Sequence, residues 1–224
     1  MTLKIDQILI ASGNKGKIYE ISQLLKEVNI KAISAAEFNI QEPEENGKSF
    51  EENSQIKAKY YAQETGLTSL ADDSGLCVDL LDGQPGIYSA DWAIDEKTKT
   101  RRFDLAFERI KQKLIEKGVD IEKQTINAHF ICNLSLFNPK NNQISSFEGR
   151  VDGKIILPAK GEKGFGYDPI FIANSMDKTF GEVFPEEKDA ISHRTQAFLQ
   201  LKSFLTPPPK DIKTPLLPNG KNPV

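Results

Sequence analysis

Apolar residues in the first half of the chain follow two different spacings in turn. The run at residues 9–11 is short and continuous, which predicts a buried strand. After a polar turn, an apolar residue recurs every three or four positions at Ile18, Ile21, Leu25 and Val28. This second pattern predicts a helix with one apolar face that packs against the core.

A second helix and strand follow after a polar stretch. Ser49, with Glu52 three positions later, has the pattern of a capping box at a helix start. Gly66 is a typical residue to end that helix. The apolar residues 67–71 then predict a strand, and we expect this strand to end at 72–75, where polar residues and a glycine follow one another.

The second half of the chain adds a hairpin. Alternating apolar residues predict strands over 128–137 and 144–151, joined by a polar turn. The other expected elements are a strand at 76–80, a helix at 103–118, a strand at 170–172 and a helix from Ser192. Helices that alternate with strands indicate an α/β fold with a mixed central β-sheet flanked by helices.

The last residues have a different composition. Prolines recur from position 207 onward and few large apolar residues remain, so no helix or core is expected there. We therefore expect one domain over residues 1–205 and an extended, Pro-rich tail over 206–224.

Composition excludes several classes of protein. The 224 residues carry a net charge of -3, which offers no general footprint for a nucleic-acid polymer. No apolar run approaches the roughly 20 residues that cross a membrane, and the chain does not begin with a signal peptide. Cys77 and Cys132 lie in apolar stretches and are expected to be buried thiols, which favours a cytoplasmic protein.

The first candidate for ligand binding lies between the strand at 9–11 and the next helix. Its residues are Ser12, Gly13, Asn14, Lys15, Gly16 and Lys17. Backbone N–H groups at a helix start attract anions, the glycines allow close approach, and the lysines add positive charge. The spacing is not that of a P-loop, however, and an ordinary helix start capped by Asn14 explains the segment as well.

Two acidic pairs are candidates for metal binding. Asp72 and Asp73 follow a predicted strand, and adjacent carboxylates repel each other unless a cation lies between them. Mg²⁺ prefers one or two carboxylates together with phosphate oxygens and water. Glu44 and Glu45 form the second pair. An ordinary polar turn is the alternative in both cases.

Two later segments suit a nucleobase. In the segment 164–169, Phe165 lies between two glycines, so its ring face is expected to be open for stacking. Asp168 follows and could accept hydrogen bonds from ring N–H groups. Lys188 and the segment 192–194 could donate to keto oxygens. Core packing of Phe165 and simple helix capping at 192–194 remain alternative interpretations.

Taken together and in this order, the motifs resemble those of the inosine triphosphate pyrophosphatases, also described as XTP/dITP diphosphatases. The resemblance extends from about Ile8 to Leu205. Its motifs lie at 12–17, 50–53 with Lys57, 71–76, 85–90, 165–171 and 192–194. The resemblance implies a homodimer of α/β subunits, each with a nucleotide cleft between two lobes. It also implies Mg²⁺-dependent hydrolysis of ITP, dITP and XTP to the monophosphate and pyrophosphate, which removes deaminated purines from the nucleotide pool.

By motif position, the resemblance also implies a role for each site residue. Asp73 would be the catalytic carboxylate and a Mg²⁺ ligand, assisted by Glu44 or Glu45. Residues that would bind the substrate are Ser12, Gly13, Asn14, Lys15, Gly16, Lys17, Lys57, Ser74, Phe165, Gly166, Tyr167, Asp168, Lys188, His193 and Arg194. Lys17 and Lys57 would stabilise the leaving pyrophosphate together with the metal.

Several points stay open at the level of sequence. Asp73 could act as a general base or only as a metal ligand. Donors at Lys188, His193 or Arg194 would favour the keto group of hypoxanthine over the amino group of adenine, because one unpaired buried donor costs about 1–3 kcal/mol. The alternative functions are a nucleotide-binding regulator without turnover, a carboxylate-pair glycosidase and a pyrophosphatase for modified pyrimidines.

Overall fold

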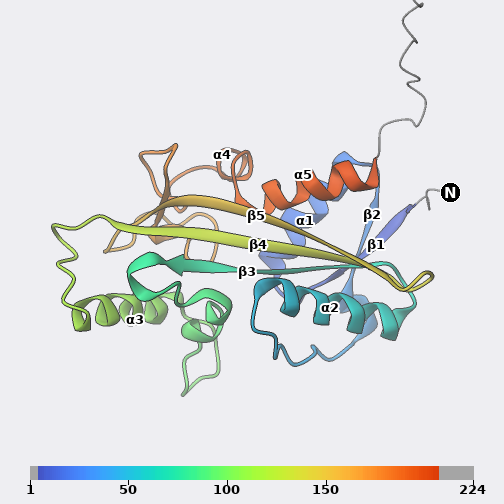
Figure 1. The fold of residues 1–224 in the computed structure, drawn as a ribbon, viewed down its shortest axis with the longest axis horizontal. Helices are drawn as coiled ribbons and strands as arrows, with labels where there is room; N and C mark the ends of the chain where they lie inside the picture. The colour runs from blue at the N-terminus through green and yellow to red at the C-terminus, as the bar shows by residue number, and fades with distance from the viewer. Residues whose placement is uncertain (1–4, 207–224) are drawn as a thin grey trace, which may run out of the picture.

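A mixed β-sheet forms the centre of the molecule. The computed structural model describes residues 5–206, and its sheet has six strands in the order β2-β1-β3-β4-β5-β6 (Figure 1). The strands are β1 (Gln7–Ala11), β2 (Lys31–Ser34), β3 (Ser69–Val78), β4 (Ile126–Asn138), β5 (Gln143–Ile155) and β6 (Phe171–Ala173). β1 is parallel to β2 and β3, and the other neighbours are antiparallel. The predicted α/β fold with a mixed sheet is therefore confirmed.

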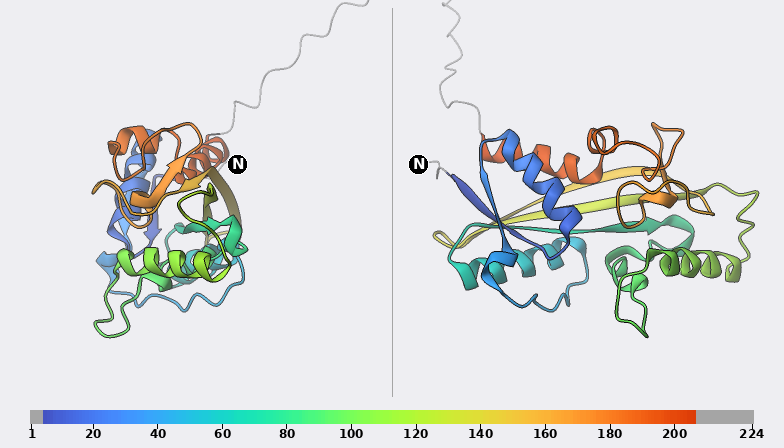
Figure 2. Two further views of the ribbon diagram at one scale, coloured as in Figure 1. Left: turned by 90° about the vertical axis from the view of Figure 1, so that its left-hand side faces the viewer. Right: turned by 180° about the vertical axis from the view of Figure 1, so that it is seen from behind.

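Helices cover both faces of this sheet (Figures 1 and 2). α1 (Lys15–Glu27) and α5 (His193–Leu205) lie on one face, and α2 (Phe50–Thr65) and α3 (Phe103–Glu116) lie on the other. A short helix, α4 (Pro185–Asp189), precedes α5. The sequence pattern did not predict β2 or α4, because four or five residues are too few to show a period.

The ends of α2 follow the sequence signals. The Ser49 hydroxyl accepts a hydrogen bond from the Glu52 N–H at 3.1 Å. Gly66 ends the helix in the left-handed conformation with φ 69°, which glycine adopts at little cost. One detail differs from a capping box, since the Glu52 carboxylate accepts from the N–H of Lys48 at 2.6 Å instead of that of Ser49.

The prediction that a strand ends at residues 72–75 is wrong. β3 continues unbroken through Asp72 and Asp73, and β4 pairs with it along its whole length. On its other side, β3 pairs with β1 only as far as Ala71. The acidic pair therefore lies inside a strand, at the point where that strand loses its parallel neighbour. The strand then ends at Val78, so the predicted alternation up to residue 80 is also too long.

Buried apolar side chains gather at two ends of the sheet. Within residues 5–206, one cluster packs around α3, and two others pack against α1 with α5 and against α2. The two-lobe arrangement and the domain boundary at residue 205 stay predictions. In the same part of the chain, no helix combines the length and apolar character needed to cross a membrane. The expected tail beyond Thr206 lies outside the described residues.

Candidate active site

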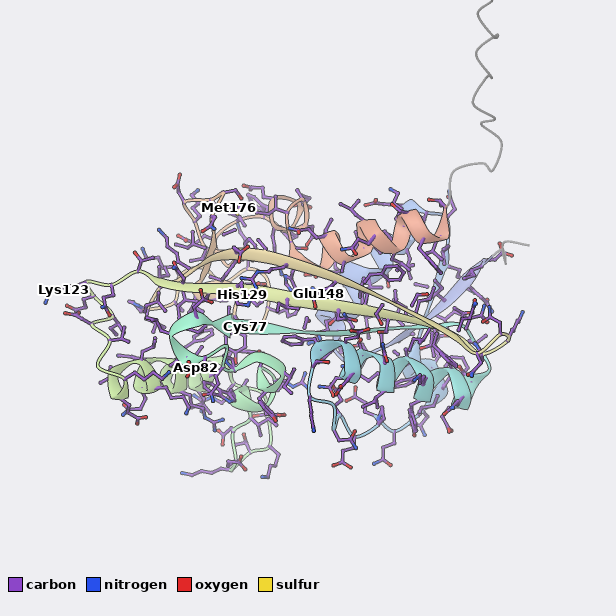
Figure 3. The ribbon with its side chains drawn as sticks, viewed as in Figure 1. Cys77, Asp82, Lys123, His129, Glu148 and Met176 are labelled. Carbon is purple, nitrogen blue, oxygen red and sulfur yellow. The ribbon has the colours of Figure 1, made fainter. Side chains whose placement is uncertain are left out.

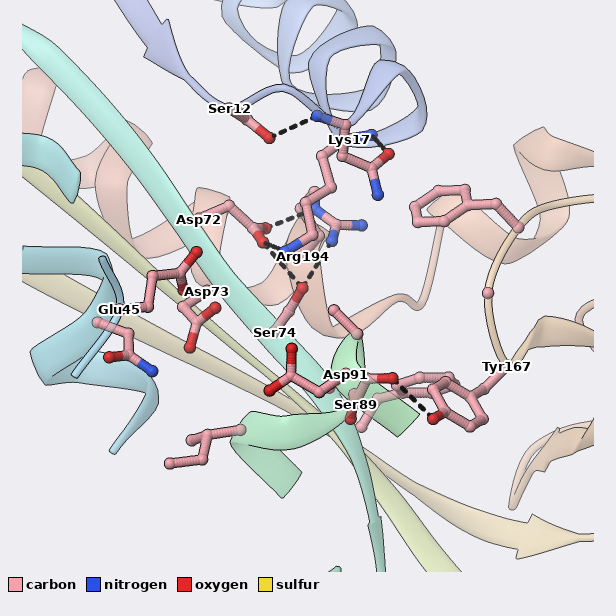
Figure 4. A pocket seen from close by; sticks show the side chains of 18 of the residues that line it. Ser12, Lys17, Glu45, Asp72, Asp73, Ser74, Ser89, Asp91, Tyr167 and Arg194 are labelled. Carbon is pink, nitrogen blue, oxygen red and sulfur yellow. Dashed lines mark hydrogen bonds and ion pairs between the residues drawn. The ribbon is translucent and has the colours of Figure 1, made fainter. Parts of the chain in front are cut away.

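A cavity of about 580 Å³ lies beside β3 (Figure 4). Segments far apart in the chain meet there, including the start of α1, the middle of α2 and the loop that carries Phe165. The predicted site residues that line it are Ser12, Gly13, Asn14, Lys17, Glu45, Lys57, Asp73, Ser74, Phe165, Gly166, Tyr167, Asp168, Lys188, His193 and Arg194. Lys15, Gly16 and Glu44 were also predicted but are not among the lining residues.

Asp72 and Asp73 point to opposite faces of the sheet, because successive side chains on a strand alternate. Asp72 faces α1 and α5. Its Oδ1 lies 2.5 Å from Lys17 Nζ, and its Oδ2 accepts from Arg194 Nε at 2.7 Å. Burial disfavours the charge of Asp72, but Arg194 and Lys17 outweigh burial and hold its pKa well below the ordinary value. Asp72 is therefore ionised and fully paired at neutral pH.

Asp73 faces α2 and is only partly satisfied. Its Oδ1 accepts from Lys57 Nζ at 3.1 Å, and the same Nζ lies 2.8 Å from Glu45 Oε2. The other oxygen, Oδ2, is buried without a hydrogen-bond partner among residues 5–206. Burial raises the pKa of Asp73 to about 6, even though Lys57 opposes the shift. The carboxylate is thus poised to exchange a proton near neutral pH.

The carboxylates beside Lys57 are suited to a divalent cation. Oδ2 of Asp73 has no hydrogen-bond partner among the described residues, and Glu45 approaches the Lys57 ammonium group that also contacts Asp73. In the described part of the chain, no set of three or more acidic, histidine or cysteine side chains forms a closed metal site. Two carboxylates that line a cavity large enough for a phosphate ligand have the donor chemistry that a hard divalent cation requires.

The segment before α1 combines a helix cap with a cavity wall. Oδ1 of Asn14 accepts from the N–H groups of Gly16 at 2.9 Å and Lys17 at 3.2 Å. The interpretation of Asn14 as a helix cap is therefore confirmed, and its side chain occupies two of the N–H groups expected to face an anion. Lys17 supplies the positive charge here, whereas Lys15 is exposed.

Gly16 allows a close contact between α1 and the Phe165 ring. A Cβ atom on Gly16 would lie 2.7 Å from Cδ1 of that ring, which is too short for any side chain. This differs from the expected approach of Gly16 to an anion. Because Gly16 has no side chain, the start of α1 packs directly against the Phe165 ring, on which a base is expected to stack.

The base end of the cavity is built around Phe165. Lys188 Nζ lies 4.7 Å from the centroid of its ring. Asp168 Oδ2 accepts from Lys188 Nζ at 2.7 Å and from the backbone N–H of Phe165 at 2.8 Å. That oxygen holds the ring and the ammonium group in place, so it is already engaged and is not a free acceptor for a base.

Glu20 on α1 is a site residue that the sequence analysis missed. One carboxylate oxygen lies 3.2 Å from Lys188 Nζ, and the other forms an ion pair with Arg194. Glu20 follows Lys17 by three positions and therefore shares its face of the helix. That spacing was the only available signal. Arg194 Nη2 also donates to Ser74 Oγ at 3.1 Å, which extends the network to β3.

His193 and Tyr167 are held by buried neighbours. The His193 ring stacks on Phe130 with centroids 4.8 Å apart, and burial keeps its pKa well below the ordinary value. His193 is therefore neutral, and its Nδ1 has no hydrogen-bond partner in the described part of the chain. The Tyr167 hydroxyl donates to the Ser89 carbonyl at 2.8 Å, which ties two walls of the cavity together (Figure 4).

Comparison with known proteins identifies the family. The model described as the Ham1 family matches residues 8–204. The chain belongs to the Ham1 family. A relative from Zymomonas mobilis, named dITP/XTP pyrophosphatase, is 47% identical over 199 residues, and the match covers 89% of this chain and 91% of the relative. A protein of the same name from Agrobacterium fabrum is 44% identical over 199 residues, with 85% of this chain and 92% of the relative covered.

Solved Ham1 structures agree with the observed fold. The HAM1 protein from Coxiella burnetii superposes with a TM-score of 0.77 at 36% identity, and covers 89% of this chain and 98% of that protein. The Ham1 protein from Staphylococcus aureus gives a TM-score of 0.74 at 36% identity, with 89% and 97% covered. The resemblance expected from the sequence motifs is therefore confirmed.

Proposed function

We propose that this Ham1-family protein hydrolyses non-canonical purine nucleoside triphosphates, namely ITP, dITP and XTP, to the monophosphate and pyrophosphate. The observation that carries the proposal is a single cavity with two chemically different ends. A carboxylate and two lysines, Asp73, Lys17 and Lys57, line one part of it, and Phe165 with Lys188 lines another. The name dITP/XTP pyrophosphatase, given to relatives 40% to 47% identical, supports the same reaction.

At the phosphate end, Asp73 would act on the attacking water. Its pKa of about 6 lets it accept a proton at neutral pH and stay ionised before it does so. Lys57 remains protonated. Burial lowers its pKa, but the negative charges of Asp73 and Glu45 outweigh burial and hold the pKa above its ordinary value. Lys17 and Lys57 would stabilise the negative charge on the phosphate chain.

A divalent metal, proposed to be Mg²⁺, would be held by Asp73 and Glu45. The buried, unpaired Oδ2 of Asp73 supports this assignment, as does the position of Glu45 2.8 Å from Lys57 Nζ. When bound, such a metal lowers the charge of the phosphates and the pKa of a coordinated water. Between the two predicted glutamates, the lining of the cavity favours Glu45 over Glu44.

At the base end, the protein would distinguish the atom at purine position six. Phe165 offers a ring face, and Lys188 lies above that ring while Asp168 fixes its ammonium group. A keto oxygen can accept from a cation there, whereas the amino group of adenine cannot. Nδ1 of the neutral His193 ring, which has no hydrogen-bond partner in the part of the chain that the structure describes, is a further polar atom at this end. Discrimination of about 1–3 kcal/mol per unpaired group would follow.

A substrate panel tests the proposal. ITP, dITP, XTP, GTP, ATP and dUTP are compared at equal concentration, with Mg²⁺ or with EDTA, by pyrophosphate release. We expect the first three to react at least about tenfold faster than ATP, as one unpaired donor implies, and only with metal. Equal rates on all purines would contradict base selection. Tight binding of ITP without pyrophosphate release would instead identify a regulator, and a preference for dUTP would identify a pyrimidine enzyme.

We also propose a homodimer located in the cytoplasm, as the family resemblance implies. Light scattering of the purified full-length chain gives the mass in solution, and a monomeric mass at assay concentration would contradict the dimer.

A further inference from the structure

One cationic side chain in the cavity differs from the others. The cations that line it are Lys17, Lys57, Lys188, Arg194 and Arg101. Four of these form ion pairs with carboxylates, and the pairs are Lys17–Asp72, Lys57–Asp73, Lys188–Asp168 and Arg194–Asp72. Within residues 5–206, the Arg101 guanidinium makes no ion pair and no hydrogen bond. Its charge and its donors are therefore available to a ligand.

A hydrogen-bonded turn places Arg101 on the cavity wall. Arg101 forms an antiparallel bridge with Ile94, and the N–H of the next residue, Arg102, donates to the Ala93 carbonyl at 2.7 Å. Within the turn, the Asp95 N–H donates to the Thr100 carbonyl at 2.9 Å. These bonds attach the backbone of Arg101 to the segment that begins at Asp91, so the position is set by the fold.

This wall lies across the cavity from the start of α1. Figure 4 shows Ser89 and Asp91 on one side and Ser12 and Lys17 on the other. The backbone of Arg101 is joined to the segment that begins at Asp91, so Arg101 lines the cavity on the Asp91 side. Asp91 also lines the cavity and has no ion pair among the described residues, and a guanidinium on the same wall would offset its repulsion of an anion.

We propose that Arg101 is a further substrate-binding residue that contacts the β- and γ-phosphates from the wall opposite Lys17. The assignment rests on the proposed function, since it takes a nucleoside triphosphate as the ligand. The four paired cations share their charge with carboxylates, so a phosphate chain of about four negative charges is incompletely balanced by them. A free guanidinium can donate to two phosphate oxygens at once, and it stabilises the pyrophosphate as that group leaves.

Two nucleotides that share a base but differ in the β- and γ-phosphates distinguish a contact to those phosphates from a contact to the base. Calorimetry measures binding of IMP and of the α,β-methylene analogue of ITP to the full-length protein, so no turnover is required. Arg101→Ala should weaken binding of the analogue about tenfold, which is the lower end of what a hydrogen bond to a charged group contributes. Binding of IMP, which lacks the β- and γ-phosphates, should weaken less than about twofold. Arg101→Lys keeps the positive charge but lacks the paired N–H donors of a guanidinium. Its affinity for the analogue should lie between those of the wild type and Arg101→Ala.

Arg102→Ala is the matched control. Arg102 is adjacent, has an exposed side chain that pairs with Asp95 and Asp104, and is not among the cavity residues. It should bind both nucleotides like the wild type. Unchanged binding of the analogue by Arg101→Ala would overturn the assignment, as would equal weakening of IMP or an equal effect of Arg102→Ala. Because the readout is binding, a wild type that binds ITP but does not hydrolyse it would refute the proposed function alone.

Discussion

Two adjacent carboxylates on β3 lie in contrasting surroundings. Asp72 faces α1 and α5, where Lys17 and Arg194 surround it and hold its pKa well below the ordinary value. Asp73 faces α2, where burial raises its pKa to about 6 and one carboxylate oxygen has no hydrogen-bond partner within residues 5–206. The alternation of the strand alone separates them. One face of β3 thus serves to anchor the site, and the other carries a carboxylate that can react or bind a metal.

Asp73→Asn should give the largest effect. Asparagine cannot accept the proton of a water or provide a charged metal ligand, so turnover of ITP should fall about 10²- to 10⁴-fold. Stability at pH 7 should not fall, because burial already disfavours the ionised form of Asp73. Pyrophosphate release and urea unfolding measure the two quantities. Asp82→Asn, an exposed carboxylate paired with Lys117, is the control. Turnover near that of the wild type would remove Asp73 from the proposed mechanism.

Asp72→Asn should act mainly on the fold. The substitution leaves Lys17 and Arg194 without their shared counter-ion, and breaking a buried pair costs about 3–5 kcal/mol. The change in the free energy of unfolding at pH 7, from urea denaturation, measures this cost. A stable variant that lost only turnover would show that Asp72, and not only Asp73, takes part in the chemistry.

The pH dependence of the two carboxylates should have opposite signs. The folded pKa of Asp73 lies above its unfolded value, so its ionisation lowers the free energy of unfolding as pH rises from about 4 to 6. The folded pKa of Asp72 lies below its unfolded value, so its contribution is present above about pH 4 and is lost in acid. Unfolding measured against pH for the wild type and Asp73→Asn isolates the first effect. A bound metal favours the ionised form of Asp73, so activity should fall at or below about pH 6, and a profile that stays flat from about pH 4 to 8 would contradict a role for Asp73 as base.

Glu20→Gln should give the smallest effect and should act on selectivity. Removing the charge frees Lys188 and Arg194 from their shared partner, so the donors near Phe165 become less well positioned. We expect the preference for ITP over ATP, measured as the ratio of kcat/KM, to fall about tenfold, as loss of one charged hydrogen bond implies. Glu27→Gln on the same helix is the control, since Glu27 is an exposed residue 3.6 Å from Lys202. An equal loss in both variants would point to a general effect on α1.

The sequence by itself determined most of the elements and the family. The structure confirms four local signals: the helical spacing of apolar residues, the helix cap at Ser49, the helix end at Gly66 and the alternation in the hairpin. The motifs in their order were enough to predict the Ham1 relationship. Each of these patterns depends on residues that are close together in the chain, so the amino-acid sequence alone reveals it.

Only the tertiary structure decided how the site is arranged. Asp72 to Gly75 is composed of good turn formers, yet it continues a strand, because β4 pairs with it along its whole length. Arg194, Lys17 and Lys57 reach the two carboxylates from three helices and compensate their charges. The different pKa values of Asp72 and Asp73, the bridging role of Glu20 and the unpaired state of Arg101 also depend on contacts between distant segments. Burial and ion pairing are set by three-dimensional neighbours, so a local pattern identifies these residue types but not their states.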